Sequence, residues 1–485
     1  MSGYVFPPTA TRELLVEALP EESDQRGKPP DQRNLHVPES HWRALHPDAP
    51  LVEGIRGSGK TVWWGALASD PHRQLLEHIL PRARITRATR VSRGFGEAKD
   101  NAYPDADTLA QLAVTFAPRI LWRTVIAQSL LEERGLPPGL TWAEKTRWVL
   151  NNPEPLEQAF RDLDTELAGR AEVHLVLFDA LYRTAREWPQ MRQLLKGLLE
   201  NLLDFRSYQA LRLKAFVRPD MLEDPSVAAF PDSSKLLNNK VELLWPPREL
   251  YSLLWQYLGN AQVGGEAFRR ACETGLGFAW SRTLDVWIPP SAMRSDEGRQ
   301  KITFHGITGQ WMGRDARRGF PYTWLPNHLA DARRQTSPRS FLSALRHAAL
   351  QPPRAGYEYA LHYEDIKRGV QRASQIRVTE MQEDYPWVQR LMNPLQGLSV
   401  PCAFAQISER WVAEDSLRAL EQEISDAEVR LPPQHLANGP EGVRRDLEEL
   451  GIFERMSDGR VNMPDVYRVG YGIGRRGGVK AIRRT

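Results

Sequence analysis

Residues 49–69, APLVEGIRGSGKTVWWGALAS, hold a glycine-rich loop between an apolar stretch and a helical pattern. Leu51 and Val52 precede the loop, and Trp63 and Trp64 begin the apolar face of the segment that follows it. An apolar strand end, a glycine turn and a helix, in this order, are typical of a parallel β-sheet whose strands alternate with helices. The stretch therefore predicts where the regular fold begins.

The loop fits the pattern G-x-x-x-x-G-K-[ST] in full. Glycines let main-chain N–H groups turn inward and cradle phosphate oxygens, and the following helix directs its positive dipole end at the same anion. Lys60 supplies positive charge to the outer phosphates, and the Thr61 hydroxyl can bind Mg²⁺. A glycine turn that matches by chance is the alternative, but the flanking strand and helix favour a nucleotide site. The predicted ATP-binding residues are Gly54, Gly57, Ser58, Gly59, Lys60 and Thr61.

A second apolar run, VHLVLFD at residues 173–179, ends in an acid. Its almost wholly apolar composition is typical of a strand buried on both faces of a parallel sheet. Given the glycine loop, Asp179 is predicted to bind Mg²⁺ beside Thr61. The alternative is that Asp179 caps a helix over residues 180–188, since Asp is a good N-cap residue, and both roles can hold together.

The positions after Asp179 lack the acid that orients the attacking water in many nucleotide hydrolases. Ala180 and Tyr182 stand there instead. Hydrolysis is then slow, or the water is oriented by a group elsewhere in the chain. Glu53 and Glu187 are candidates, and the sequence does not choose between them.

Composition limits the class of protein. The chain has 485 residues, a formal net charge of +3, 41% hydrophobic and 26% charged residues, which is typical of a globular protein with several domains. Its two cysteines, Cys272 and Cys402, lie far apart without metal or redox spacing. The N-terminus lacks the order of a signal peptide, and no apolar run reaches the ~18 residues of a membrane span. We therefore expect a soluble, cytoplasmic protein without membrane contact.

The C-terminal part has a different pattern. A charge-rich helix ends at Gly451, and residues 452–464 contain an Asp-Gly turn typical of the two-stranded wing of a winged helix. Two basic clusters are either solvated faces or binding sites for a polyanion such as DNA or RNA. The first holds Arg82, Arg84, Arg87, Arg90 and Arg93, and the second, after Asp465, holds Arg468, Arg475, Arg476, Lys480, Arg483 and Arg484.

These segments predict an α/β fold with a parallel-sheet P-loop NTPase core, inserted helices, a helical lid and a C-terminal winged-helix domain. The expected domains are a flexible N-terminal arm (1–48), the core (49–262) with a helical insertion (about 100–170), the lid (263–395) and the winged-helix-like domain with its basic tail (396–485).

In the order of its motifs the chain resembles the AAA+-related P-loop ATPases of bacteria that include the KAP and STAND branches. Besides the glycine loop and VLFDALYR (176–183), the resemblance rests on LKAFVRPDML (213–222) and TSPRSFLSAL (336–345). It implies that Arg218 and Arg339 act as the sensor-1 and sensor-2 residues beside Lys60 and Asp179 in the catalytic set. The segment between Thr61 and Asp179 is longer than a compact core needs, and KAP members often carry membrane helices that this chain lacks. The arginine finger stays open among Arg183, Arg186, Arg317 and Arg318.

The resemblance implies an ATP- and Mg²⁺-dependent switch in a bacterial multiprotein system, with anti-phage defence as one such setting. Homo-oligomers and a protein partner are expected, and the winged helix and tail offer a surface for DNA or RNA. Two alternatives remain: a DNA-binding regulator whose nucleotide site is regulatory or vestigial, and a scaffold subunit of a larger complex.

Overall fold

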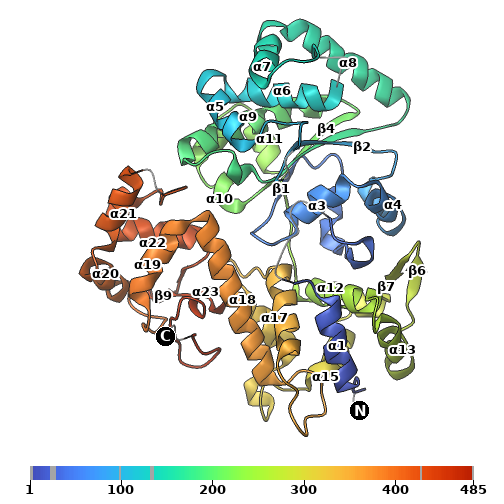
Figure 1. The fold of residues 1–485 in the computed structure, drawn as a ribbon, viewed down its shortest axis with the longest axis vertical. Helices are drawn as coiled ribbons and strands as arrows, with labels where there is room; N and C mark the ends of the chain where they lie inside the picture. The colour runs from blue at the N-terminus through green and yellow to red at the C-terminus, as the bar shows by residue number, and fades with distance from the viewer. Residues whose placement is uncertain (1–3, 22–28, 98–99, 132–135, 427–428, 483–485) are drawn as a thin grey trace. The chain divides into compact units, whose positions relative to one another are not determined.

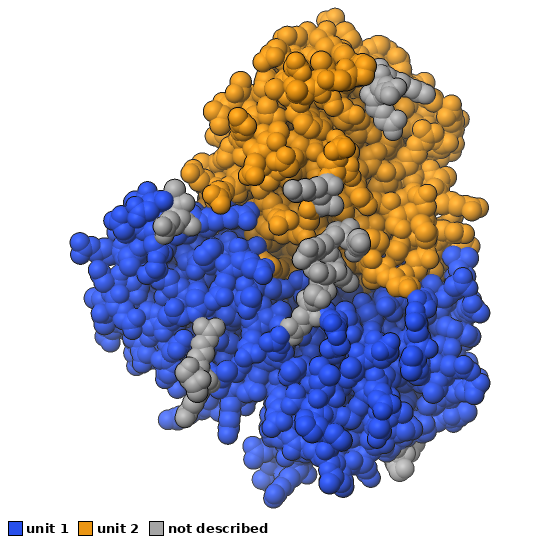
Figure 2. All heavy atoms as spheres, in the orientation of Figure 1, with its two compact units in different colours: residues 1–23, 33–36, 245–485 blue, residues 24–32, 37–244 orange. Residues whose placement is uncertain are grey.

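The computed structural model describes residues 4–21, 29–97, 100–131, 136–426 and 429–482. These residues fall into two compact units, which Figure 2 distinguishes by colour. As far as they are described, unit 1 comprises residues 1–23, 33–36 and 245–485, and unit 2 comprises residues 24–32 and 37–244. Over the described ranges, no helix combines the length and the hydropathy that a bilayer span requires.

Unit 2 is built on a five-stranded sheet with the strand order β2-β3-β4-β1-β5 (Figure 1). All four pairings between neighbouring strands are parallel. This arrangement confirms the predicted α/β fold class with a parallel sheet. The strands are β1 (Leu51–Glu53), β2 (Arg90–Phe95), β3 (His174–Phe178), β4 (Leu211–Val217) and β5 (Val241–Glu242).

The central strands are mostly apolar on both faces, and the buried Lys214 of β4 is accommodated because it donates to the carbonyls of Ala44, His46 and Ala49. Every residue of β1 and β3 is buried, as expected for strands covered by helices on both sides. Strand β2, with the sequence RVSRGF, was not predicted from the sequence. It lies at the edge of the sheet, where one side of the strand is open and arginines are tolerated.

The helices of unit 2 connect these strands. Four of them, α5 to α8, occupy the chain between β2 and β3 and account for the long separation of Thr61 from Asp179. The helices are α2 (Trp42–Leu45), α3 (Lys60–Leu67), α4 (Asp70–Ile79), α5 (Ala106–Thr115), α6 (Pro118–Leu131), α7 (Trp142–Asn151), α8 (Pro153–Gly169), α9 (Trp188–Asp204), α10 (Pro219–Leu222) and α11 (Ser233–Leu237).

Unit 1 is mainly helical, with two antiparallel hairpins, β6 (Ser281–Thr283) with β7 (Val286–Ile288) and β8 (Glu454–Arg455) with β9 (Val461–Asn462). Its helices are α1 (Pro8–Ala18), α12 (Pro247–Asn260), α13 (Gly265–Leu276), α14 (Ser291–Ser295), α15 (Glu297–Thr308), α16 (Pro321–Leu329), α17 (Pro338–Leu350), α18 (Tyr363–Asp384), α19 (Pro386–Met392), α20 (Phe404–Ala413), α21 (Ser416–Ser425), α22 (Gly439–Glu449) and α23 (Asp465–Arg468).

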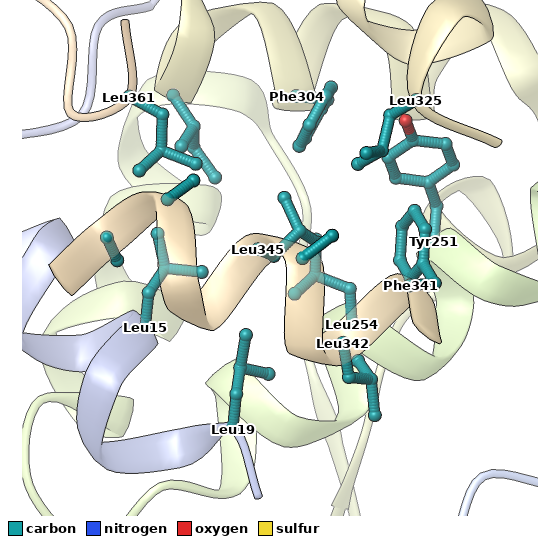
Figure 3. Close-up of a cluster of buried hydrophobic side chains, with 14 of the residues drawn as sticks. Leu15, Leu19, Tyr251, Leu254, Phe304, Leu325, Phe341, Leu342, Leu345 and Leu361 are labelled. Carbon is teal, nitrogen blue, oxygen red and sulfur yellow. The ribbon is translucent and has the colours of Figure 1, made fainter. Parts of the chain in front are cut away.

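The core of unit 1 gathers apolar side chains from helices that are far apart in the sequence (Figure 3). Phe341 and Leu345 of α17, Leu254 of α12 and Leu15 of α1 all belong to this cluster. Each of these four side chains is almost fully removed from solvent, which stabilises the folded state by roughly 1.5–3 kcal/mol per side chain.

Part of the expected flexible N-terminal arm (1–48) is a packed helix. Residues 8–18 form α1, whose Leu14 and Leu15 are buried in the core of unit 1, and the Arg12 guanidinium donates to the carbonyl of Ala360 at 2.6 Å. The expectation of flexibility is therefore wrong for this stretch. The apolar residues of α1 recur at helical spacing, but the polar residues that follow them led to the prediction of a flexible arm. Residues 22–28 of the arm lie outside the described ranges.

The division between the two units differs from the expected boundary between core and lid at residue 262. Helix α12 lies before that boundary, yet it belongs to unit 1, which resumes at residue 245. The reason is its composition, because all but the first two of its residues are buried. A helix that is apolar on most of its surface must lie inside a core, and its partners are the helices of unit 1.

Two arginines of the expected basic tail, Arg468 and Arg475, make hydrogen bonds within unit 1. The Arg468 guanidinium is fully buried, where it pairs with Asp465 at 2.6 Å and donates to the carbonyls of Ile473 (3.1 Å) and Val479 (2.7 Å). Arg475 also bonds to Asp465, at 3.2 Å. These two arginines of the expected basic tail are therefore held within the fold, because a buried carboxylate requires cationic partners. Arg476 and Lys480 are exposed, and Arg483 and Arg484 lie outside the described ranges.

Replacing Arg468 with alanine is expected to destabilise the protein. The change removes the main partner of the buried Asp465 carboxylate and leaves two carbonyls without their donor, so the free energy of unfolding should fall by about 3 kcal/mol. Chemical denaturation measures this difference. The matched control is Arg476→Ala, which removes an exposed arginine of the same segment. Equal stability of the two variants would contradict the structural role of Arg468.

Candidate functional site

The glycine loop joins the end of β1 to the start of α3. The N–H of Gly54 bonds to the carbonyl of Val217 in β4 at 3.1 Å, which ties the loop to the neighbouring strand. Gly57 and Gly59 have φ angles of +77° and +98°, in the region that side chains rarely adopt. Gly59 caps α3 in this left-handed conformation, so that the helix begins at Lys60 with its N-terminus facing the loop.

The Lys60 side chain folds back over this loop. Its ammonium group donates to the carbonyl of Gly54 at 2.6 Å and to that of Ile55 at 2.9 Å. Ser58, between these residues and the helix, is buried. The loop thus combines a positive charge, a helix N-terminus and left-handed glycines, which are features that favour the binding of an anion.

Asp179 meets this loop from the end of β3. The Thr61 hydroxyl donates to Oδ2 of Asp179 at 2.7 Å, although the two residues are 118 positions apart in the chain. Asp179 is 2% exposed, and its own N–H bonds to the carbonyl of Phe95 in β2 at 3.0 Å. The structure therefore brings together the two residues that were predicted to hold Mg²⁺.

The alternative, that Asp179 caps a helix, is not what the structure shows. Ala180 adopts a left-handed conformation with φ +55°, and a short 3₁₀ turn, η5 (Leu181–Arg183), follows it. The next α-helix, α9, begins at Trp188. The Asp179 side chain therefore accepts a hydrogen bond from the Thr61 hydroxyl and does not cap the N-terminus of a helix.

The electrostatic surroundings of Asp179 suit a divalent cation. Burial raises the pKa of Asp179, and the hydrogen bond from Thr61 and the charge of Lys60 oppose that increase, whereas the charge of Glu97 adds to it. A buried carboxylate of this kind is favoured in its ionised form when a cation binds beside it. A carboxylate and a hydroxyl are also the oxygen ligands that Mg²⁺ prefers, so the residues present fit this ion.

Arg218 follows the last residue of β4, the strand that lies between β1 and β3. Its guanidinium group lies 4.3 Å from the centre of the Tyr182 ring and pairs with Asp220 at 3.5 Å. Arg218 is buried at the same end of the sheet as the loop and Asp179, because the carboxyl ends of parallel strands lie together at one end. Its role as sensor 1 stays a prediction.

Arg339 belongs to unit 1. It lies in the first turn of α17, and its guanidinium group pairs with Glu380 of α18 at 2.5 Å. Half of the Arg339 side chain is exposed, whereas the Glu380 side chain is nearly buried. Its role as sensor 2 stays a prediction, as does the choice of an arginine finger.

The two acids suggested as water-orienting groups lie in different surroundings. Glu53 ends β1 and is buried in an ion pair with Lys240. Glu187 is exposed ahead of α9. A third acid, Glu97, was missed in the sequence. It lies two residues beyond β2, and its Oε1 accepts a hydrogen bond from the Tyr182 hydroxyl at 2.8 Å.

The first basic cluster is divided among separate partners in unit 2. Arg90 pairs with Glu172 at 2.8 Å, and Arg93 pairs with Asp100 at 3.8 Å and lies 4.8 Å from the Trp64 ring. Arginines that are paired in this way favour the interpretation of a solvated face over that of a polyanion site.

No family model matches the chain, and no curated protein matches it. Among solved structures, the chain is similar to the crystal structure of Cdc6p from Pyrobaculum aerophilum, with 11% identity, a TM-score of 0.29, and coverage of 86% of this chain and 83% of that one. It is also similar to the ORC2 protein of Aeropyrum pernix in ADPNP–ADP complexes, with 13% identity, a TM-score of 0.31, and coverage of 91% and 92%.

Proposed function

We propose that the protein is a P-loop ATPase that binds ATP and Mg²⁺ at the carboxyl ends of the strands in the unit 2 sheet. The observation that carries the proposal is the 2.7 Å hydrogen bond between Thr61 and Asp179, beside a loop that holds the Lys60 ammonium. A chance glycine turn has no reason to meet a buried acid from another strand. A phosphate-binding loop does, because its hydroxyl and that acid serve the same ion.

Each residue of the site has a defined task in this proposal. The main-chain N–H groups of residues 57–61 and the N-terminus of α3 bind the phosphate oxygens. The Lys60 ammonium exchanges its carbonyl partners for the outer phosphates. Thr61 and Asp179 would hold Mg²⁺, which when bound neutralises the negative charge of the phosphates. Arg218 would respond to the terminal phosphate from the end of β4.

The finer proposal is an ATP-dependent switch of the AAA+-related, KAP- or STAND-like kind in a bacterial multiprotein system such as anti-phage defence. Its support is the resemblance of the motifs. Homo-oligomers and a protein partner belong to the same proposal. Arg183 and Arg186 are exposed just after Asp179, where a neighbouring subunit could be reached.

A DNA-binding regulator is the second candidate function. Helix α22 is followed by the β8–β9 hairpin, and two arginines of that hairpin, Arg455 and Arg460, are exposed. Exposed cations on a two-stranded wing can contact phosphates of a nucleic acid backbone. A gel shift at two salt concentrations that compares the wild type with R455E/R460E tests this candidate.

A titration with ATP and Mg²⁺ tests the leading proposal. Ligand at about 100 times its Kd should stabilise the folded protein by about 2.7 kcal/mol, which appears as a rise in Tm. ATP and GTP are to be compared in the same titration, each with and without Mg²⁺. An unchanged Tm at millimolar ATP and Mg²⁺, together with no heat of binding by calorimetry, would refute the proposal.

The Mg²⁺ affinity of the ATP complex should increase with pH. Burial raises the pKa of Asp179, so the protonated form persists to higher pH than in an exposed Asp, and Mg²⁺ must displace that proton. Lowering the pH from about 8 to about 5.5 should therefore weaken Mg²⁺ binding more steeply than the titration of ATP alone explains. Calorimetry of Mg²⁺ binding at several pH values measures the slope. D179N, which cannot titrate, supplies the reference slope of the nucleotide, and identical slopes would contradict the prediction.

A further inference from the structure

Glu97 reaches the candidate site through the register of two neighbouring strands. Phe95 of β2 pairs with Phe178 of β3, and the N–H of Asp179 bonds to the carbonyl of Phe95 at 3.0 Å. The chain therefore leaves β2 and β3 at the same level of the sheet, with Glu97 two residues beyond one end and Asp179 one residue beyond the other. The charge of Glu97 is felt at Asp179, where it contributes to the raised pKa.

Tyr182 holds the Glu97 carboxylate in place. Its hydroxyl donates to Oε1 of Glu97 at 2.8 Å, from the turn that directly follows Asp179. The Tyr182 ring is itself packed by the Arg218 guanidinium group, 4.3 Å from the ring centre. A connected set of side chains therefore lies beyond the carboxyl ends of the adjacent strands β2, β3 and β4. Its members are Glu97, Tyr182 and Arg218.

The other two acids are less suited to positioning a water molecule. Glu53 is buried in an ion pair with Lys240, and that cation competes with a water for its oxygens. Glu187 is exposed beside α9, where its side chain caps nothing. Glu97 combines a fixed carboxylate, half-burial and the neighbourhood of Asp179.

We infer that Glu97 is the acid that orients the attacking water in ATP hydrolysis and that Tyr182 is its positioning residue. The inference rests on the proposed function and names the group that takes the place of the missing acid after Asp179. In the step, the water oxygen forms a bond to the γ-phosphorus, and the bond between that phosphorus and the β–γ bridging oxygen breaks. ADP leaves with the electron pair of the broken bond. The proton of the water passes to the Glu97 carboxylate and from there to the phosphate product.

The experiment measures ATP affinity and phosphate release separately for matched pairs of variants. E97Q should keep the Kd for ATP within about threefold and lower kcat about 100-fold, because the amide no longer accepts the proton. Y182F should also keep the Kd and lower kcat about tenfold, because Glu97 loses its hydrogen bond. The controls are E157Q and Y208F, since Tyr208 donates to Glu157 at the same 2.8 Å distance elsewhere in unit 2. Both controls should retain wild-type kcat.

A further variant separates this inference from the view that an acid is simply missing at position 182. If that absence limits turnover, Y182D should raise kcat. If Tyr182 positions Glu97, Y182D should lower kcat, because a carboxylate would repel Glu97 where the hydroxyl now bonds to it.

The outcomes distinguish the inference from the proposed function. Wild-type protein that does not bind ATP refutes the proposed function itself. Wild-type protein that binds ATP without releasing phosphate overturns the inference and the hydrolytic part of the proposed function, while ATP binding stands. A wild type that releases phosphate together with an E97Q variant of normal affinity and normal kcat overturns the inference alone. A gain of turnover in Y182D also overturns it.

Discussion

ATP binding is expected to weaken about 1000-fold when Lys60 is replaced by alanine. The ammonium group of Lys60 lies over the glycine loop, where it bonds to the carbonyls of Gly54 and Ile55. Charge-assisted contacts to phosphate contribute about 1.5–3 kcal/mol each, and the loss of two corresponds to about 4 kcal/mol. Titration of a fluorescent ATP analogue against both proteins measures the change in Kd.

The control for this substitution is K235A. Lys235 also belongs to unit 2, but its side chain is 63% exposed and pairs with Asp232 on the surface. The K235A protein should bind ATP as tightly as the wild type does. Removal of Lys60 also spares the buried core, so K60A should keep the Tm of the protein without ligand. Wild-type affinity in K60A would show that the loop does not bind the phosphates.

Turnover is expected to fall about 1000-fold in D179N, which keeps the shape of the side chain and removes its charge. Asp179 is the buried acid that meets Thr61 at 2.7 Å, and the proposed role for both is to hold Mg²⁺. Loss of a group that stabilises charge in the transition state of phosphoryl transfer lowers the rate by roughly 100- to 1000-fold. Phosphate release at saturating ATP, over a range of Mg²⁺ concentrations, measures the effect.

Mg²⁺ dependence is the decisive readout for D179N. ATP alone should still bind, because the loop and Lys60 are intact, but Mg²⁺ should no longer tighten that binding. The matched control is D107N, which changes an exposed acid in the first turn of α5. A D179N variant that responds to Mg²⁺ like the wild type would remove Asp179 from the ion site.

The parts of the fold that could be predicted are those with a strong local signal. Strand β3 is an almost continuous apolar run, and β4, with the sequence LRLKAFV, has apolar residues at five of its seven positions, so both are recognisable without knowledge of their neighbours. Strand β2 could not be recognised, because its two arginines and its place at the edge of the sheet give it a polar sequence. Helix α1 was missed for a similar reason, since its apolar face is short and its partners follow much later in the chain.

The candidate site also has residues that could be predicted from the sequence and a residue that could not. The glycine loop has a fixed spacing, and that spacing led to Thr61 and then to Asp179, which the structure places in contact. Glu97 has no such motif around it. Its place depends on the register between β2 and β3, and only a pairing of strands can bring it beside Tyr182. A residue that acts through tertiary register leaves no local pattern to detect.

The chain order of the two units has a consequence for synthesis on the ribosome. Helix α1 precedes its partners in the core of unit 1, because α12 and α17 are made only after residues 37–244 have emerged. At roughly 5–20 residues per second, the nascent helix waits on the order of 15–60 s for α17. During that interval its apolar face is exposed to chaperones, while residues 37–244 can already acquire their sheet. Translation therefore favours completion of unit 2 before unit 1 can close its core.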